Sequence, residues 1–526
     1  MIRQLFRYKG GVKLPEHKQE STQQPIQKIA LPDRLTLPLQ QHIGAAAIPV
    51  VSVGEQLLKG QMIAKSGGHI SAPVHAPTSG KVVEIGEFAI PHPSGLKAPC
   101  IVIEVDGNDA WCDHRKPVGD CHNYTPEQIR EYIRNAGVVG LGGAGFPSFL
   151  KLTVGRDRVV ETLILNGAEC EPFISCDDLL MRERAEEIIK GLMIMKHALM
   201  AQACVIGIEQ NKPQAAAALR KAITALAVEV EVVEVPTLYP TGGEKQLIKI
   251  LTNKEIPPKS LPIEKRVVVH NVGTAAAVYR AICLGEPLID RVITVTGAVK
   301  NPGNYEIPFG ISAAQLLEQV GVEKESIERI IHGGPMMGFA LNTLDIPLIK
   351  TSNCLLVTDP KTVPLLNKQL ALACIRCGSC ADVCPINLLP QQLYWHSRAK
   401  DFDKVQDYNL FDCIECGCCD YVCPSQIPLV QYFRFAKTSI WQAEQDKKQA
   451  ELAKERHEFR QFRIEREKAE KKARHKAKAA KVAAKNSGTD DKKKAIEEAM
   501  ARVKAKKQQQ EAANISTSKT EPGDNT

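Results

Sequence analysis

The segment CIRCGSCADVCP, residues 374–385, recurs as CIECGCCDYVCP at residues 413–424. Both copies fit the pattern C-x2-C-x2-C-x3-C-P, and every cysteine of the first copy returns 39 residues later. Cysteines at steps of three wrap a short loop around one cluster, whereas zinc sites usually separate two C-x-x-C pairs by a long loop. The repeat therefore predicts a helical ferredoxin-type domain with two 4Fe-4S clusters. A zinc site or a set of unliganded thiols is the alternative.

The ligand sets follow from the two-cluster pattern, in which the fourth cysteine of each run binds the other cluster. One cluster is predicted on Cys374, Cys377, Cys380 and Cys423, and the other on Cys413, Cys416, Cys419 and Cys384. Cys418 is a ninth cysteine, and we expect it to be a small buried side chain. His396 lies between the motifs, and we expect it on a connecting helix and not at a metal. Such clusters only conduct electrons, so another site must load and unload them.

Composition bounds the class of protein. A chain of 526 residues is too long to fold around a single hydrophobic core, so we expect several domains. It has no apolar run of about 18 residues, and its first residues, MIRQLFRYKGGVK, lack the apolar core of a signal peptide. Seventeen cysteines in such a chain indicate metal rather than disulfides. We expect a protein that stays in the cytoplasm.

The net positive charge is concentrated at the C-terminal end. From Trp441 onward there are 23 Lys and Arg against 15 Asp and Glu, whereas the preceding 440 residues hold 45 of each sign. The net charge of +8 therefore belongs to a low-complexity tail, and it does not indicate a nucleic-acid-binding domain. We expect a solvated helix that frays into disorder. Attraction to anionic lipid is the sharper alternative, and binding to nucleic acid comes third.

A second motif, GLGGAG at residues 140–145, fits G-x-G-x-x-G through Gly140, Gly142 and Gly145. The preceding residues, TPEQIREYIRNAGVV, look helical, so the strand that a Rossmann fingerprint requires before its glycines is missing. A helix starting near Pro147 would instead place the glycine-rich backbone and Lys151 around a phosphate. The run VVETLILNG predicts a strand whose carboxyl end carries Asn166, Glu169 and Glu171. A loop that merely turns is the alternative.

These segments, with YPTGGEKQL (239–247) and HNVGTAAAV (270–278), resemble the NADH-binding flavoprotein subunit of respiratory complex I. The resemblance implies a Rossmann-like α/β domain with non-covalent FMN and NADH as substrate. It assigns FMN binding to the glycine loop and to Lys151, Asn166, Glu169, Asn271 and Thr274. It assigns NADH contacts to Phe146, Glu171 and Glu244, and it makes Glu169 and Glu171 the candidate catalytic carboxylates. Leu141, Ala168, Gly243 and Gly273 depart from the family, which usually has Arg, Asp, Glu and Glu there.

Two flanking segments predict further modules. Residues 53–85 alternate short β-rich runs with Gly and Pro turns and resemble the barrel-sandwich hybrid of lipoyl domains, but their tip at Lys65 lacks the modification signature. Residues 292–322 read strand, Asn-Pro-Gly turn, strand and helix, and they resemble the soluble-ligand-binding β-grasp domain. HGGPMMG, residues 332–338, could bind an anion, and we rank it as a tight connection.

Together these predictions describe a multidomain α/β protein. We expect a barrel-sandwich hybrid at 1–115, an FMN/NADH domain at 120–285, a β-grasp domain at 290–345, a two-cluster ferredoxin domain at 364–436 and a charged tail at 441–526. This order resembles the RnfC family, whose members belong to the Rnf (Rsx) electron transport complexes.

That resemblance implies a peripheral subunit on the cytoplasmic side of the cell inner membrane. It would transfer electrons between NADH and ferredoxin, or a ferredoxin-like subunit, while other subunits translocate ions. FMN is needed because a hydride arrives as an electron pair and a cluster accepts one electron at a time. Two alternatives stay open: an electron-relay adaptor without flavin, or the diaphorase subunit of a soluble hydrogenase or formate dehydrogenase.

Overall fold

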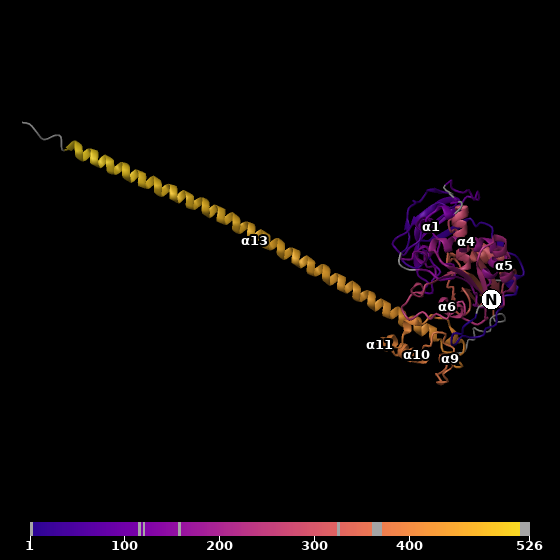
Figure 1. Cartoon of the computed structure of the whole chain (residues 1–526). Coiled ribbons are helices and arrows are strands. Elements are labelled where there is room, and N and C mark those ends of the chain that lie inside the picture. Colours follow the sequence, from indigo (N-terminus) through magenta and orange to yellow (C-terminus); the bar gives the residue numbers. More distant parts are fainter. Residues whose placement is uncertain are drawn as a thin grey trace, which may run out of the picture. The chain divides into compact units, whose positions relative to one another are not determined.

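The computed structural model describes residues 4–113, 117–118, 121–155, 159–322, 327–359 and 371–515 (Figure 1). The chain forms two compact units, Met1–Lys437 and Thr438–Thr526. The start of the predicted ferredoxin domain, residues 364–370, lies outside the described residues, as does the end of the tail from residue 516. No described helix combines the length and apolar character needed to cross a bilayer.

The N-terminal part is built from antiparallel strands. One sheet has the order β2-β8-β7-β4, and a smaller sheet has the order β3-β5-β6. The strands are β2 Arg34–Pro38, β3 Ile48–Pro49, β4 Gln56–Leu57, β5 Met62–Lys65, β6 Val74–His75, β7 Gly80–Ala89 and β8 Lys97–Val105. Gly and Pro turns keep most of these strands at two to five residues, whereas β7 and β8 are ten and nine residues long. The two sheets share one core. Lys65 is exposed at the end of β5.

A parallel sheet with the order β11-β10-β9-β12 forms the centre of the next part. Its strands are β9 Thr162–Gly167, β10 Ala203–Glu209, β11 Glu231–Val235 and β12 Val267–Asn271. β9 and β10 are almost fully buried, as expected for parallel strands covered by helices on both faces. The helices are α1 Pro126–Asn135, α2 Ser148–Leu152, α3 Cys176–Glu183, α4 Ala185–Leu199, α5 Pro213–Leu226, α6 Glu244–Thr252 and α7 Val272–Tyr279.

Local signals set the helix that precedes the glycine loop. The Thr125 hydroxyl accepts a hydrogen bond from the N–H of Gln128, whose side-chain oxygen accepts one from the Thr125 N–H, and Pro126 opens the helix. Ile129 and Ile133 are buried on one face. The prediction of a helix, and not a strand, before GLGGAG is confirmed.

A mixed six-stranded sheet follows, in the order β1-β14-β13-β17-β15-β16. Its members are β1 Gln27–Lys28, β13 Asp290–Gly297, β14 Gly303–Pro308, β15 Arg329–His332, β16 Phe339–Ala340 and β17 Cys354–Thr358, with α8 Ala313–Val320 packed against it. The predicted strand, turn, strand and helix of residues 292–322 are present. The sheet also includes β1 from the N-terminal region, which pairs with β14 at one edge. Its centre includes β17 from beyond residue 345, which pairs with β13 and β15.

The cysteine repeat is also a repeat of backbone conformation. Arg376 and Glu415, 39 residues apart, have φ of 58° and 56°, and Gly378 and Gly417 have φ of 85° and 77°. Each of these glycines precedes a one-turn helix, α9 Ser379–Asp382 or α12 Cys418–Tyr421. α10 Pro390–Ala399, which contains His396, and α11 Phe402–Asp407 connect the two halves. Left-handed residues at matching positions turn each loop so that its first three cysteines face one cavity.

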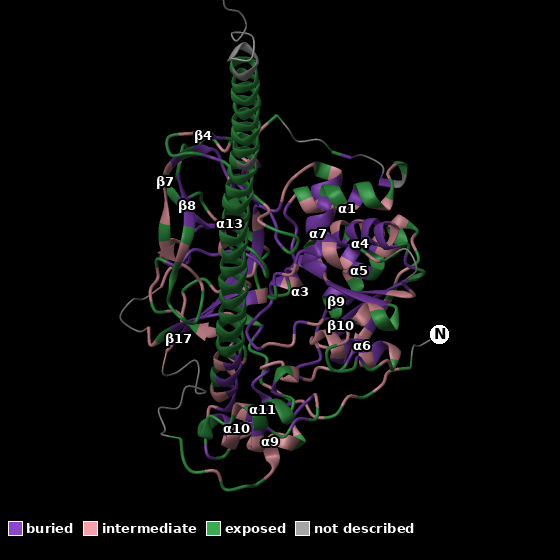
Figure 2. Cartoon of the chain, turned by 90° about the vertical axis from the view of Figure 1, so that its left-hand side faces the viewer, coloured by how far each residue is buried: buried purple, intermediate pink, exposed green. Residues whose placement is uncertain are grey.

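The last helix, α13 Leu429–Ile515, begins in the first unit and makes up nearly all of the second. Its residues beyond 441 are almost all exposed (Figure 2). Ion pairs one turn apart, such as Arg463–Glu467 at 3.7 Å and Arg466–Glu470 at 3.5 Å, line its surface. The predicted solvated helix is therefore present through Ile515.

Candidate functional site

Contacts with neighbouring segments hold one side of the glycine loop, and its other side is exposed. The N–H of Leu141 donates to the Thr274 hydroxyl at 2.9 Å, and the Leu141 carbonyl accepts from Arg291 Nη2 at 3.0 Å. Gly145 has φ of +64°, and a Cβ there would lie 2.6 Å from Thr351 Cγ2. These contacts fix the loop conformation without using its outer surface.

That outer surface offers donors to a ligand. Gly142, Gly143 and Ala144 are exposed, and no described residue accepts a hydrogen bond from their N–H groups. Successive free N–H groups of this kind make an anion-binding concavity. Asn271, the N-cap of α7, lies 3.4 Å from the position of a Cβ on Gly142. The loop therefore fits a phosphate, as predicted for a flavin nucleotide.

The carboxyl ends of β9 and β12 bring further predicted residues together. Asn166 and Asn271 are paired in register, and Asn166 donates to the Gly242 carbonyl at 2.7 Å. Lys151 donates to Glu244 at 2.7 Å and to the Val269 carbonyl at 3.2 Å. The predicted phosphate-binding lysine and the glutamate predicted to contact NADH thus form one partly exposed ion pair. Phe146 lies half-buried at the end of the glycine loop.

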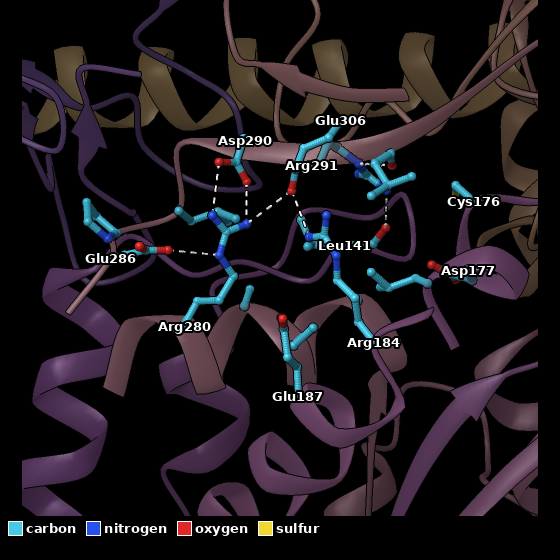
Figure 3. A pocket seen from close by; sticks show the side chains of 17 residues that line it. Leu141, Cys176, Asp177, Arg184, Glu187, Arg280, Glu286, Asp290, Arg291 and Glu306 are labelled. Carbon is cyan, nitrogen blue, oxygen red and sulfur yellow. Dashed lines mark hydrogen bonds and ion pairs between the residues drawn. The ribbon is translucent and has the colours of Figure 1, made fainter. Parts of the chain in front are cut away.

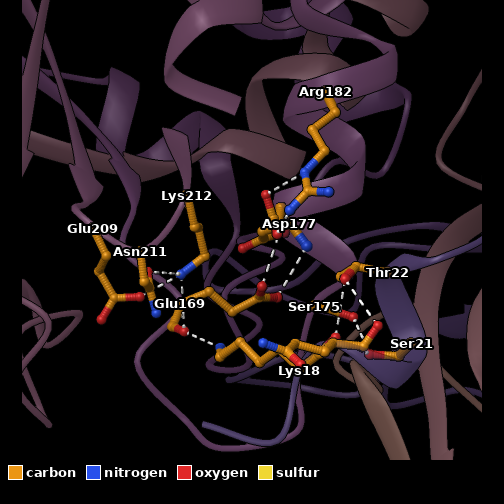
Figure 4. Close-up of polar contacts among 12 residues, drawn as sticks. Lys18, Ser21, Thr22, Glu169, Ser175, Asp177, Arg182, Glu209, Asn211 and Lys212 are labelled. Atoms are coloured by element: carbon orange, nitrogen blue, oxygen red, sulfur yellow. Dashed lines mark hydrogen bonds and ion pairs between the residues drawn. The ribbon is translucent and has the colours of Figure 1, made fainter. Parts of the chain in front are cut away.

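Glu169 is buried and binds the start of α3. One of its oxygens accepts from the N–H of Asp177 at 2.9 Å (Figure 4). Asp177 also accepts from Asn271 Nδ2 at 2.6 Å. Burial and the neighbouring Glu169 carboxylate raise the pKa of Asp177 to about 7. Lys18 and Lys212 donate to the Glu169 carbonyl, which keeps this acidic turn in place.

Glu171 binds the loop at residues 332–338. Its Oε1 accepts from the N–H groups of Met336 at 2.7 Å and Met337 at 3.0 Å, and burial raises the pKa of Glu171. The loop HGGPMMG, which we ranked as a tight connection, therefore binds an anionic group that belongs to the chain itself. Gly334 is required for this approach, since a Cβ there would lie 2.1 Å from Glu171 Cγ.

The eight predicted cluster ligands line two separate cavities. Cys374, Cys377, Cys380 and Cys423 line one, and Cys384, Cys413, Cys416 and Cys419 line the other, together with Cys418. Each cavity thus takes its fourth cysteine from the opposite motif, as the two-cluster pattern requires.

The spacing of the sulfurs argues against zinc. Four thiolates around one zinc ion at about 2.3 Å would place their sulfurs about 3.8 Å apart. Among the described residues, only Glu169, Cys176 and Asp177 form a group whose potential ligand atoms all lie within 4.8 Å of one another. The cysteines of each cavity are therefore spread too widely for a single ion, and the donor set fits a larger cluster.

The two cavities differ in exposure and in neighbours. Cys377 is exposed, whereas Cys384, Cys416 and Cys419 are buried. The hydroxyl of Tyr239, in the loop before α6, donates to the Cys416 carbonyl at 2.6 Å. The inner cavity, lined by Cys384, Cys413, Cys416 and Cys419, therefore lies next to the parallel-sheet domain.

Several residues of this arrangement carry no sequence signal that we recognised. They act as structural supports and not as motif members, and they come from segments distant in sequence: Lys18, Asp177 and Arg291. Met336 and Met337 belong to the quoted segment HGGPMMG, but nothing in that segment indicates Glu171 as their partner. The residue Tyr239 stands in a quoted motif, but its contact with the cluster loop depends on the packing of two domains.

A further cavity separates α3 and α7 from β13 and β14 (Figure 3). Ion pairs cross it, including Arg280–Asp290 at 2.6 Å and Arg184–Glu306 at 2.7 Å. Its volume of about 50 Å³ is far below that of a nucleotide site. It is an ionic junction between the two domains.

Four family models match the chain. They are the RnfC barrel sandwich hybrid domain at residues 6–108, the Nuo51 FMN-binding domain at 133–280, the SLBB domain at 292–340 and the 4Fe-4S dicluster domain at 373–427. The predicted cofactors, FMN and 4Fe-4S clusters, are thereby confirmed.

Curated relatives cover most of the chain. The C component of the ion-translocating oxidoreductase complex of Pseudomonas aeruginosa is 48% identical over 88% of this chain and 59% of its own length. The proteins of the same name from Pectobacterium atrosepticum and Serratia proteamaculans are 46% and 45% identical over 95% of this chain and 71% and 70% of their own lengths. The chain thus spans about three fifths of the Pseudomonas relative. An NAD+-reducing [NiFe]-hydrogenase structure aligns over 58% of this chain and 61% of its own at 20% identity, with a TM-score of 0.44. Because of its identity to these relatives, this chain belongs to the RnfC family, the C components of ion-translocating oxidoreductase complexes.

Proposed function

We propose that this chain carries electrons between NADH and a one-electron acceptor, as a peripheral subunit on the cytoplasmic side of an ion-translocating membrane complex. Other subunits of that complex would translocate the ion, and ferredoxin or a ferredoxin-like subunit would exchange the electrons. The flavin supplies conversion between two-electron and one-electron transfer when it is bound.

The contact between Tyr239 and Cys416 is the observation that carries this proposal. It places the loop that follows β11 of the flavin domain directly against the ligand loop of the inner cavity. Met336 also touches that loop, since a Cβ on Gly417 would lie 3.0 Å from its carbonyl oxygen. A flavin site and a cluster site on two domains in direct contact suit direct electron transfer.

The residue roles follow from position. We assign the FMN phosphate to the free N–H groups of the glycine loop, with Gly140, Gly142 and Gly145 shaping it. Five side chains surround the same edge of the sheet and would hold the rest of the nucleotide: Lys151, Asn166, Glu169, Asn271 and Thr274.

Three residues remain for NADH. Phe146 and Glu244 are both partly exposed, and we assign them to contacts with the dinucleotide. Glu171 would act there only after leaving its two N–H partners on the 332–338 loop. We therefore assign Glu169 and Glu171 to the support of the reaction site, as carboxylates that hold its backbone.

The order of the clusters follows from burial. The inner cavity is buried against the flavin domain, whereas the cavity with Cys374, Cys377, Cys380 and Cys423 includes an exposed cysteine. We assign the inner cluster to exchange with the flavin and the outer one to exchange with the partner.

The test is anaerobic titration of the purified, iron-replete and FMN-supplied protein with NADH. We expect bleaching of the flavin band, followed by a spin-resonance signal from reduced clusters. Intact clusters with no bleaching would overturn the proposal and favour a relay adaptor without flavin. Recovery of the native protein from the soluble fraction, without other subunits, would favour the diaphorase of a soluble enzyme.

A further inference from the structure

The excess positive charge of the chain lies in one short part of α13. Residues 471–485, KKARHKAKAAKVAAK, hold seven Lys or Arg and no Asp or Glu. The helix before them, 441–470, holds eight of each sign, and residues 486–526 hold eight basic and seven acidic residues. Seven of the eight net charges of the whole protein therefore lie within fifteen residues.

Helical geometry gathers most of these charges on one face. At 3.6 residues per turn, five of the seven fall within an arc of about 80° and run along about 21 Å of the axis. We call them the cationic stripe: Lys471, Arg474, Lys478, Lys481 and Lys485. All five are exposed. Most of the remaining residues of this segment are alanines.

The segment that carries the stripe contains no acidic residue, and only Lys471 and Arg474 have one a turn away, at Glu467 and Glu470. Upstream, Lys454, Arg463 and Arg466 each pair with a glutamate one turn away. Among the described residues, no ion pair involves a basic residue of 471–485, and beyond Lys476 no acidic residue lies within one helical turn. A helix needs no such run for its own stability, because like charges one turn apart repel.

We propose that the cationic stripe binds the anionic lipid surface of a bilayer. A straight row of exposed charges suits a flat anionic surface, and the segment lacks an apolar stripe, so the helix would lie on the headgroups without inserting. The choice of lipid over nucleic acid rests on the proposed function, which places this chain at a membrane. The stripe would hold the protein near its membrane complex and speed its association with the other subunits.

Lipid binding should depend on the alignment of the charges on one face of the helix as well as on their number. A helix with its side chains is about 10 Å across, which is close to the Debye length of about 10 Å at 0.1 M salt. Charges on the far side are therefore largely screened from the surface. Binding should depend on the alignment of the stripe and should weaken steeply as salt increases.

The test is flotation of the full-length protein with vesicles of phosphatidylcholine alone or with 30% phosphatidylglycerol. We expect binding to the anionic vesicles only, and at least a tenfold loss when Lys471, Arg474, Lys478, Lys481 and Lys485 are all changed to Gln. The matched control removes five charges outside the stripe, by changing Lys492, Lys493, Lys494, Lys504 and Lys506 to Gln, and should lose less than threefold.

A second variant keeps the composition. Exchanging Lys478 with Ala477, Lys481 with Val482 and Lys485 with Ala484 spreads the charges around the helix, and we expect a loss of at least threefold. Equal binding by the stripe variant and the wild type, or binding to RNA without binding to anionic vesicles, would overturn the inference. Flavin bleaching by NADH is measured on the same samples, so that loss of lipid binding and failure of the redox proposal are told apart.

Discussion

The hydroxyl of Tyr239 donates a hydrogen bond to the main-chain carbonyl of Cys416 at 2.6 Å, joining segments 177 residues apart. Tyr239 is 3% exposed, so water does not replace this bond when it is lost. A second side chain, Lys437, donates to the Cys413 carbonyl at 2.7 Å. The inner ligand loop is thus held by side chains at two of its cysteines.

Changing Tyr239 to Phe should loosen one cluster only. We expect loss of a buried hydrogen bond worth about 1 kcal/mol, and hence about fivefold faster release of half the iron to a chelator. The control is Tyr394→Phe, because Tyr394 lines the outer cavity and its hydroxyl bonds Arg398 and no ligand backbone. Equal acceleration of all the iron in Tyr239→Phe would contradict the assignment of this contact to the inner cluster.

The ninth cysteine provides a matched pair of variants. Cys416→Ser should reduce the bound iron from about eight to about four per chain, because it removes a ligand of one cluster. Cys418→Ser should retain about eight, although Cys418 is fully buried and lines the same cavity. Iron analysis of anaerobically purified protein checks both, and loss of iron from Cys418→Ser would show that the ligand set is wrong.

The loop at residues 332–338 can be tested through its contact with Glu171. Gly334→Ala places a Cβ against Glu171 Cγ and should destabilise the protein by about 1–3 kcal/mol. Glu171→Ala removes the obstructing atoms, so the same glycine substitution should cost less than about 0.5 kcal/mol in that background. Thermal unfolding of the four proteins measures the coupling, and simple additivity would count against the contact.

Flavin binding depends on the conformation of the glycine loop. Gly145→Ala strains a residue at φ of +64° and brings Cβ within 2.6 Å of Thr351, so the loop must move. We expect the flavin content to fall at least fivefold while the iron content stays unchanged. Gly155→Ala is the control, because that exposed glycine has open space around its Cβ position. Normal flavin content in Gly145→Ala would remove the loop from the FMN site.

Stability should depend on pH through Asp177. Its pKa is raised to about 7 in the folded chain against about 3.9 when unfolded, so the folded state binds the extra proton between these values. Stability should therefore decrease as the pH rises from 4 to 7, by on the order of 3 kcal/mol. The side chain in Asp177→Asn cannot ionise, so the thermal midpoint of this variant should change less with pH over this range. Parallel curves for the two proteins would place the pH dependence elsewhere.

The cysteine motifs and the strand ends are predictable from the sequence because those features are local. The spacing of four cysteines, the capping residues around Pro126 and the polar residues after β9 each act within a few positions of the chain. The departure of the glycine loop from the Rossmann pattern was also visible in this way, since it depended only on the helix before it.

Long-range packing decided the rest. Nothing local in HGGPMMG indicates that its N–H groups bind Glu171, and nothing near Tyr239 indicates Cys416 as its partner. Those contacts form only when the β-grasp sheet, the parallel sheet and the cluster loops pack together, because a backbone donor can serve any acceptor brought near it. The chain's own residues thus determined which cofactors it can hold, whereas tertiary structure decided which side chains support each cofactor and which cluster lies beside the flavin domain.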